Sequence, residues 1–272
     1  MTTLIDTHCH LQDPRFERAE TMAAVERARE ADVEMVLCGY DAPTNAAALE
    51  IATGKEGVYP SVGFHPHEAA GVTGAMLAEL ESLARLPEVV AVGEIGLDFF
   101  RNLSPHDAQR RVLDEQLAIA ARVGKPVSVH TRGAEDAALE PLTTYSHLRH
   151  WRDGDAPIGV MHCFGGTLEQ ARPYVAIGFV VSIACTITYP KNDETRAIAA
   201  SLPIEALVLE TDSPYLPPQF MRGERNEPLH VRSAAEAVTA ARNEPVSRIT
   251  AATTATARRV FALSELRVPA WS

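Results

Sequence analysis

Short apolar runs rich in β-branched residues recur along the whole chain, and longer stretches with helical spacing separate them. Eight of these runs have the length of buried strands, at residues 4–7, 33–38, 58–62, 89–92, 127–129, 158–161, 179–183 and 207–209. The stretches between and after them place apolar residues three and four positions apart, which predicts helices over 16–31, 75–86, 107–123, 168–177, 193–202, 229–242 and 246–263. The pattern therefore alternates strand and helix from one end to the other.

Eight strands that are apolar on both faces and alternate with helices indicate a parallel (β/α)8 TIM barrel, an α/β fold. A doubly wound open sheet is the alternative, but neither GxGxxG nor GxxxxGK[ST] follows the first apolar run. Ser104 and Pro105 are typical of an N-cap followed by the first helical turn, and Gly124 and Gly178 stand where helices should end. We expect residues 1–272 to form one TIM-barrel domain, with any functional site at the carboxyl ends of the strands.

Composition narrows the class of partner. The chain has 25 basic and 36 acidic residues, so its formal net charge of −11 argues against a protein that coats nucleic acid with a basic surface. Any anionic substrate must be held locally, by a positive charge that is almost entirely arginine. No run of residues resembles a signal peptide, a transmembrane helix or a lipidation motif, which makes the cytoplasm the expected location, and nothing implies an obligate protein partner.

His8 and His10 end the first apolar run, and residues two apart on a strand share a face. Two imidazoles on one rigid element make half of a metal site, although two polar residues at a strand end remain the simpler interpretation of this pair alone. The same residue types follow other predicted strands: His65, His67, Glu94, His130, His162 and Asp212. In a barrel these strand ends converge at one mouth, so together they favour a metal site.

The motifs around these residues resemble the TatD-type metal-dependent deoxyribonucleases over nearly the whole chain. The blocks that carry the resemblance are DTHCHL from Asp6, VGFHPH from Val62, GEIGLD from Gly93, HTR from His130, HCFGG from His162, LETDSPYL from Leu209 and RGERNEP from Arg222. Two differences lie outside the expected ligands. Gly165 stands where the family usually has serine, and Phe99 and Phe100 stand where tyrosines are common.

The resemblance implies a centre of two divalent ions (Mg, Mn or Zn). In it, His8, His10 and Asp212 hold one metal, His130 and His162 hold the second, and Glu94 bridges them. The implied activity is hydrolysis of phosphodiester bonds, as a 3′-5′ exonuclease on single-stranded DNA, with a metal-bound hydroxide as nucleophile. Asp212 would also accept a proton.

Four side chains are expected to contact substrate: His65, Arg132, Arg222 and Arg225. His65 would hold or protonate an oxygen of the scissile phosphate, unless it only fixes its own loop. The arginines would bind phosphates, unless they pair with nearby carboxylates instead. We expect His67 either to support a residue that holds the metal or to be structural, and Glu210 to contact a metal-bound histidine.

The same residues are compatible with two other functions. One is a two-metal hydrolase of a small ester, amide or lactone, and the other is a non-catalytic protein whose metals only stabilise the barrel.

Overall fold

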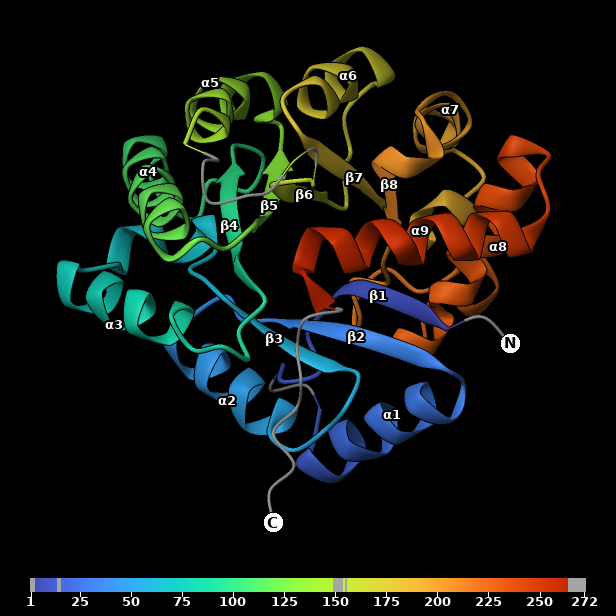
Figure 1. The fold of residues 1–272 in the computed structure, drawn as a ribbon, viewed down its shortest axis with the longest axis horizontal. Coiled ribbons are helices and arrows are strands. Elements are labelled where there is room, and N and C mark those ends of the chain that lie inside the picture. The colour runs from blue at the N-terminus through green and yellow to red at the C-terminus, as the bar shows by residue number, and fades with distance from the viewer. Residues whose placement is uncertain (1–2, 14–15, 149–153, 155, 264–272) are drawn as a thin grey trace.

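The computed structural model describes residues 3–13, 16–148, 154 and 156–263, and within them eight parallel strands follow one another around a barrel (Figure 1). The strands are β1 (Leu4–Cys9), β2 (Val33–Cys38), β3 (Val58–Val62), β4 (Ala91–Asp98), β5 (Val127–Arg132), β6 (Gly159–His162), β7 (Phe179–Ile183) and β8 (Leu207–Leu209). Every residue of β1, β4, β6, β7 and β8 is buried. This burial on both faces explains why the strands are apolar runs rather than alternating ones.

The barrel closes between β1 and the residues that follow β8. Cys9 and Ser213 form an isolated parallel bridge, the Asp212 N–H donates to the His8 carbonyl at 2.9 Å, and the His10 N–H donates to the Ser213 carbonyl at 2.6 Å. Because β8 has only three residues, the pairing that completes the circle falls on the segment beyond it. The predicted (β/α)8 barrel is confirmed, and the segment that closes it also carries Asp212.

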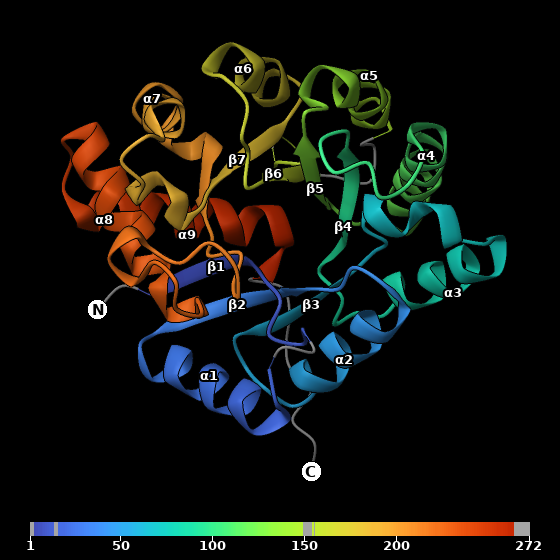
Figure 2. The same cartoon turned by 180° about the vertical axis from the view of Figure 1, so that it is seen from behind.

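Helices surround the strands on the outside (Figures 1 and 2). They are α1 (Arg18–Glu30), α2 (Ala42–Ala52), α3 (Gly74–Ala84), α4 (His106–Val123), α5 (Glu135–Ser146), α6 (Leu168–Ala176), α7 (Asp193–Ser201), α8 (Val231–Arg242) and α9 (Val246–Phe261). Short 3-10 turns join some of them: η1 (Pro66–Gly71), η3 (Cys185–Thr188), η4 (Ile204–Ala206), η5 (Gln219–Met221) and η6 (Pro228–His230). Of the helices within the described residues, none is both long and apolar enough to cross a membrane.

Local features account for the differences from the predicted elements. We did not predict α2 or α5; α5 contains Pro141, which usually ends a helix pattern. The N-cap of α4 is Pro105 rather than Ser104, and the Ser104 hydroxyl instead donates to the His67 carbonyl at 2.7 Å. Gly124 adopts a left-handed φ of 69° at the C-cap of α4, as predicted.

Strand β4 begins within the predicted run but continues six residues past Val92, to Asp98, and its pairing with β5 shifts register between Val92 and Ile95. Gly96 has a φ of +145°, and a Cβ at this position would lie 1.9 Å from the His130 carbonyl oxygen. Only glycine allows the backbones of β4 and β5 to approach so closely. This contact holds the carboxylates of β4 next to His130.

Candidate metal centre

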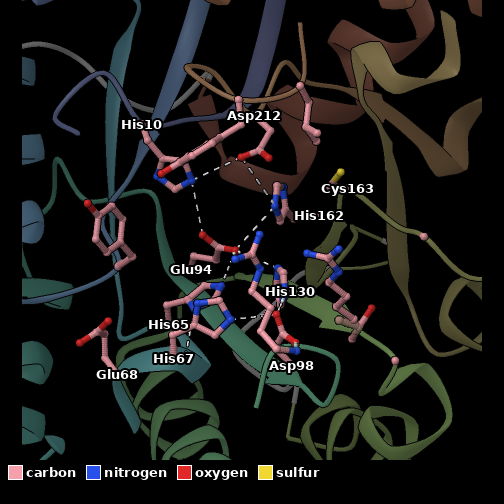
Figure 3. Close-up of a pocket in the computed structure, with 18 of the residues that line it drawn as sticks. His10, His65, His67, Glu68, Glu94, Asp98, His130, His162, Cys163 and Asp212 are labelled. Carbon is pink, nitrogen blue, oxygen red and sulfur yellow. Dashed lines mark hydrogen bonds and ion pairs between the residues drawn. The ribbon is translucent and has the colours of Figure 1, made fainter. Parts of the chain in front are cut away.

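A cavity of about 920 Å³ opens at the carboxyl end of the barrel. Its lining includes His10, His65, Glu94, His130, His162 and Asp212, each from a different strand or the segment after it. Figure 3 shows these side chains pointing toward one another around Glu94. Residues predicted from separate strand ends therefore share one site.

Glu94 lies at the centre of the group, buried within β4. Its Oε2 is 3.5 Å from His8 Nε2 and 3.4 Å from His10 Nε2. Its Oε1 faces three other imidazole nitrogens, at 3.2 Å (His130 Nδ1), 3.4 Å (His65 Nε2) and 3.6 Å (His162 Nε2). One oxygen faces one set of candidate ligands and the other oxygen faces a second set, which is the arrangement of a bridging carboxylate.

His10, the residue that follows β1, is held by a contact on the side away from the cavity. His10 Nδ1 donates to the Cys38 carbonyl at 2.7 Å, so a neutral His10 presents an unprotonated Nε2 to the cavity. That atom lies 3.1 Å from His8 Nε2 and 3.5 Å from Asp212 Oδ1. Asp212 reaches this position with a left-handed φ of 55°, a conformation that aspartate tolerates better than most residues. His8, His10 and Asp212 thus form one three-residue cluster.

His162 is held by the buried carboxylate predicted to contact a ligand. Its Nδ1 donates to Glu210 Oε2 at 3.1 Å and lies 3.1 Å from Glu210 Oε1 as well, and its Nε2 points toward Glu94. Burial opposes a charged imidazole here, but the carboxylates of Glu210, Glu94 and Asp212, Glu210 first, together raise the pKa of His162 to about 10. A carboxylate behind a histidine fixes the ring and increases its basicity toward a metal.

Asp98 was not among the predicted site residues, although it belongs to the cavity lining. Its Oδ2 accepts a hydrogen bond from His67 Nε2 at 2.8 Å and lies 3.4 Å from His130 Nε2. Burial opposes its charge, yet contacts with His130, the Arg101 N–H and His67 hold the pKa of Asp98 below its usual range. His67 is thus linked to His130 through Asp98.

The tautomer of His65 differs from that of His10 and His162, whose Nδ1 atoms donate. Its Nδ1 accepts the backbone N–H of His67 at 3.1 Å, so a neutral ring carries its proton on Nε2, the atom that faces Glu94. Burial lowers the pKa of His65 to about 4. Although His65, Glu94 and His130 lie close enough to form a cluster, this tautomer makes His65 a hydrogen-bond donor to the cavity rather than a ligand.

The donor set fits divalent cations. The Nε2 atoms of His8 and His10 face each other, and the Nε2 atoms of His10 and His162 face carboxylate oxygens. Imidazole nitrogens and carboxylate oxygens that can donate an electron pair to a metal ion therefore surround one space. Burial opposes protonation of His10, but its hydrogen bond to Asp212 and the charge of Glu94 raise its pKa. Burial also works against the charge of Glu94, and the surrounding histidines, His65 first, still keep its pKa well below the usual range. Protons or metal ions must neutralise this cluster.

The three arginines expected to bind phosphate lie in different surroundings. Arg132 lines the cavity, with its guanidinium carbon 4.2 Å from the centre of the Phe100 ring. Arg222 lies over the ring of Tyr189 at 4.6 Å, and the structure does not place it in the cavity lining. Arg225 donates to Glu20 at 3.0 Å, the kind of carboxylate pairing expected under the alternative interpretation.

Comparison with known proteins gives one consistent result. Residues 5–262 match the model of a family described as TatD related DNase. A metal-dependent hydrolase, YabD of Bacillus subtilis (strain 168), is 32% identical over 96% of this chain and 100% of its own length. The 3′-5′ ssDNA/RNA exonuclease TatD of Erwinia billingiae (strain Eb661) is 35% identical over 96% of this chain and 99% of its own.

A solved structure is similar over the same extent. The crystal structure of YJJV, a TatD homologue from Escherichia coli K12, superposes with a TM-score of 0.87 at 33% identity. The match covers 95% of this chain and 98% of that one. The barrel and the segments around its mouth are therefore shared with this relative.

Proposed function

Because the chain belongs to the TatD-related DNase family and is a metal-dependent hydrolase, we propose that it removes nucleotides from the 3′ end of single-stranded DNA by hydrolysing phosphodiester bonds. A relative 35% identical over almost its whole length is named a 3′-5′ ssDNA/RNA exonuclease. The observation in the structure that best supports the proposal is the position of Glu94, with one oxygen toward the β1 histidines and the other toward His130 and His162.

Two divalent ions at this centre would be held by His8, His10 and Asp212 on one side and by His130 and His162 on the other, with Glu94 between them. Ions of this kind lower the pKa of water and neutralise charge on a phosphate. Imidazole nitrogens suit zinc, while carboxylates and phosphate oxygens suit magnesium or manganese, so the donor set alone leaves the metal open.

The protein side chains would then orient substrate and move protons. His65 presents a protonated Nε2 to the cavity, so it donates a hydrogen bond to a phosphate oxygen. Asp212, at the open side of the cluster, has a carboxylate placed to accept the proton of an attacking water. Arg132, which lines the cavity, supplies positive charge for the next phosphate along the strand.

A single-stranded substrate suits this site better than a duplex because the candidate ligands lie at the bottom of a cavity. The Nε2 atoms of His8 and His162 belong to buried side chains, so the scissile phosphate must enter the barrel mouth to reach them. One unpaired strand end can enter such a cavity more readily than two paired strands.

The test uses single-stranded DNA labelled at either end, with protein stripped by a chelator and then given magnesium, manganese or zinc. Label at the 3′ end should be released as mononucleotide at once, whereas label at the 5′ end should shorten step by step. Glu94→Gln should lower the rate by roughly 100-fold or more, since it removes the charge between both ligand sets.

Glu68→Gln is the matched control, because Glu68 is an exposed carboxylate in the lining of the same cavity (Figure 3). It should retain the wild-type rate within about twofold. If Glu94→Gln digests DNA as the wild type does, the assignment of the centre is wrong. If the wild type is inactive on DNA and hydrolyses a small ester, amide or lactone instead, the substrate class is wrong and the metal centre stands.

A further inference from the structure

The loop between β4 and α4, which contributes Arg101 to the cavity lining, exposes two large apolar side chains. Phe100 is 67% exposed and Leu103 is 64% exposed, and Arg101 of the same loop lines the cavity. We refer to residues 99–105 as the rim loop. Exposed apolar side chains gathered on one loop that borders a cavity can mark a ligand-binding surface.

Phe100 forms one layer of an open stack. The Arg132 guanidinium carbon lies 4.2 Å from the centre of its ring, and Arg132 is itself an exposed residue that lines the cavity. A guanidinium on a ring is a favourable contact that leaves the rest of the ring available. Phe99 differs, because its ring is stacked on His106 at 3.8 Å and is only partly exposed. Of these two neighbouring aromatic residues, Phe100 is thus the one open to solvent.

The stack has a fixed position relative to the metal centre. Asp98 Oδ1 accepts the backbone N–H groups of Phe100 at 2.9 Å and Arg101 at 2.7 Å. The other oxygen of the same carboxylate contacts His67 and His130. Asp98 is also the β4 partner of Arg132 on β5. One buried carboxylate therefore orients both the start of the rim loop and a candidate ligand histidine.

The spacing suits a polymer that passes from the stack to the centre. Arg132 follows His130 by two residues of β5, or about 7 Å along an extended strand. This is of the order of one or two nucleotides, since phosphates of a stacked strand rise about 3.4 Å per step. The cavity lining also contains a carboxylate close to Arg132 in the chain, because Glu135 lines the cavity and accepts the backbone N–H of Gly133 at 3.2 Å.

We propose that Phe100, supported by Arg132 and flanked by Arg101, is a binding subsite for one nucleobase and its adjoining phosphate in a single-stranded nucleic acid. The aromatic ring stacks on the base and the two arginines neutralise the phosphate. The inference rests on the proposed function and specifies where its substrate binds. A paired base has no free face for such a stack, so the subsite favours single strands, and it accepts every base because each has a flat face.

Binding of a dye-labelled single-stranded oligonucleotide, measured by anisotropy with metal removed, tests the subsite apart from cleavage. Phe100→Ala should weaken binding about tenfold, within the range found when a stacking aromatic is removed. Phe100→Leu should be as weak because it keeps an apolar side chain without a flat face, and Phe100→Trp should restore wild-type binding. Leu103→Ala is the matched control, since it removes a side chain of similar exposure from the same loop.

A second measurement locates the base. In a series of oligonucleotides with one abasic position each, the wild type should lose affinity at a single distance from the 3′ end, and Phe100→Ala should be insensitive there.

The outcomes separate the two proposals. If binding depends on Phe100 but the wild type cleaves no DNA, the subsite proposal stands and the exonuclease proposal is wrong. If the wild type cleaves DNA but wild type and Phe100→Ala bind the oligonucleotide equally well, the subsite proposal is wrong and the exonuclease proposal stands. Equal loss in Phe100→Ala and Leu103→Ala would show only a general apolar contact and overturn the subsite, as would a wild type that binds no oligonucleotide.

Discussion

Replacement of Glu210 by glutamine tests how the buried carboxylate behind His162 controls metal binding. The two oxygens of Glu210 lie 3.1 Å from His162 Nδ1, and glutamine keeps the shape and one acceptor oxygen while it removes the charge. We expect metal-free Glu210→Gln to hold His162 with a lower pKa, because the Glu210 charge is the largest of the contacts that raise it.

The size of the effect follows from the pKa of about 10 for His162, against an ordinary value of 6.5. At about pH 8, an imidazole with a pKa of 10 is roughly 99% protonated, and one with a pKa of 6.5 is roughly 3% protonated. A ligand histidine must lose this proton when metal binds. The variant should therefore release between about half a proton and one proton fewer than the wild type, even if its His162 pKa falls only to about 8.

Calorimetric titration of chelator-stripped protein with zinc or manganese, in two buffers of different ionisation enthalpy, measures the protons released. Glu205→Gln is the matched control, because Glu205 is exposed and lies just before β8. The unfolding free energy of the metal-free protein gives an independent readout. Because the pKa of His162 is higher in the folded than in the unfolded protein, His162 stabilises the fold below about pH 6.5, and this contribution is lost between about pH 6.5 and 10. The unfolding free energy of Glu210→Gln should therefore decline less steeply over that pH range than that of the wild type.

Equal proton release by wild type and Glu210→Gln would refute the reasoning, since it would mean that His162 is neutral before metal binds or never binds it. A lower release in Glu205→Gln as well would attribute the change to the total charge rather than to the contact with His162.

Two further predictions concern stability. Gly96→Ala should lower the unfolding free energy by roughly 3 kcal/mol or more in denaturant titrations, because its Cβ would lie 1.9 Å from the His130 carbonyl oxygen at a φ of +145°. The control is Gly165→Ala, whose Cβ would meet nothing within 4 Å and which should change the unfolding free energy by less than about 0.5 kcal/mol. Equal effects of the two substitutions would contradict this prediction. Burial, and then the charge of Glu34, raises the pKa of Tyr59 to about 12. The stability that this shift contributes is complete below about pH 10 and is lost between about pH 10 and 12. Tyr59→Phe should remove this alkaline decline when the unfolding free energy is compared at about pH 8 and pH 11.

Residues at strand ends were predictable because the geometry of a parallel barrel leaves little freedom. A two-residue period places His8 and His10 on one face, and the convergence of strand ends brings Glu94 and Asp212 to them. Asp98 was missed because glycines and Glu94 interrupt the apolar pattern of β4, so the strand was expected to end at residue 92. A strand that continues through polar residues is supported by its neighbours, here by the close approach of Gly96 to β5.

The role of His65 could not be predicted from its position in the chain. A histidine after β3 can act as a ligand, a donor or a loop residue, and the difference depends on which ring nitrogen carries the proton. That is decided by the His67 N–H, which donates to His65 Nδ1 because the loop enters η1 at this point. Expectations about chemistry at such positions require the backbone of the loop, since residue type alone leaves the tautomer undetermined.

Substrate contacts depend even more on tertiary structure. Arg132 and Arg225 are both arginines beside family motifs, yet Arg132 lines the cavity while Arg225 pairs with Glu20, which lies 205 residues earlier. Phe99 and Phe100 are adjacent and identical, but His106 covers the first and the second is open to solvent. The candidate metal ligands come from strand ends and are constrained by the barrel, whereas most of the expected substrate contacts lie in loops, where the contacts of a side chain depend on residues distant in sequence. The chemistry of such a barrel is therefore easier to predict from sequence than its substrate.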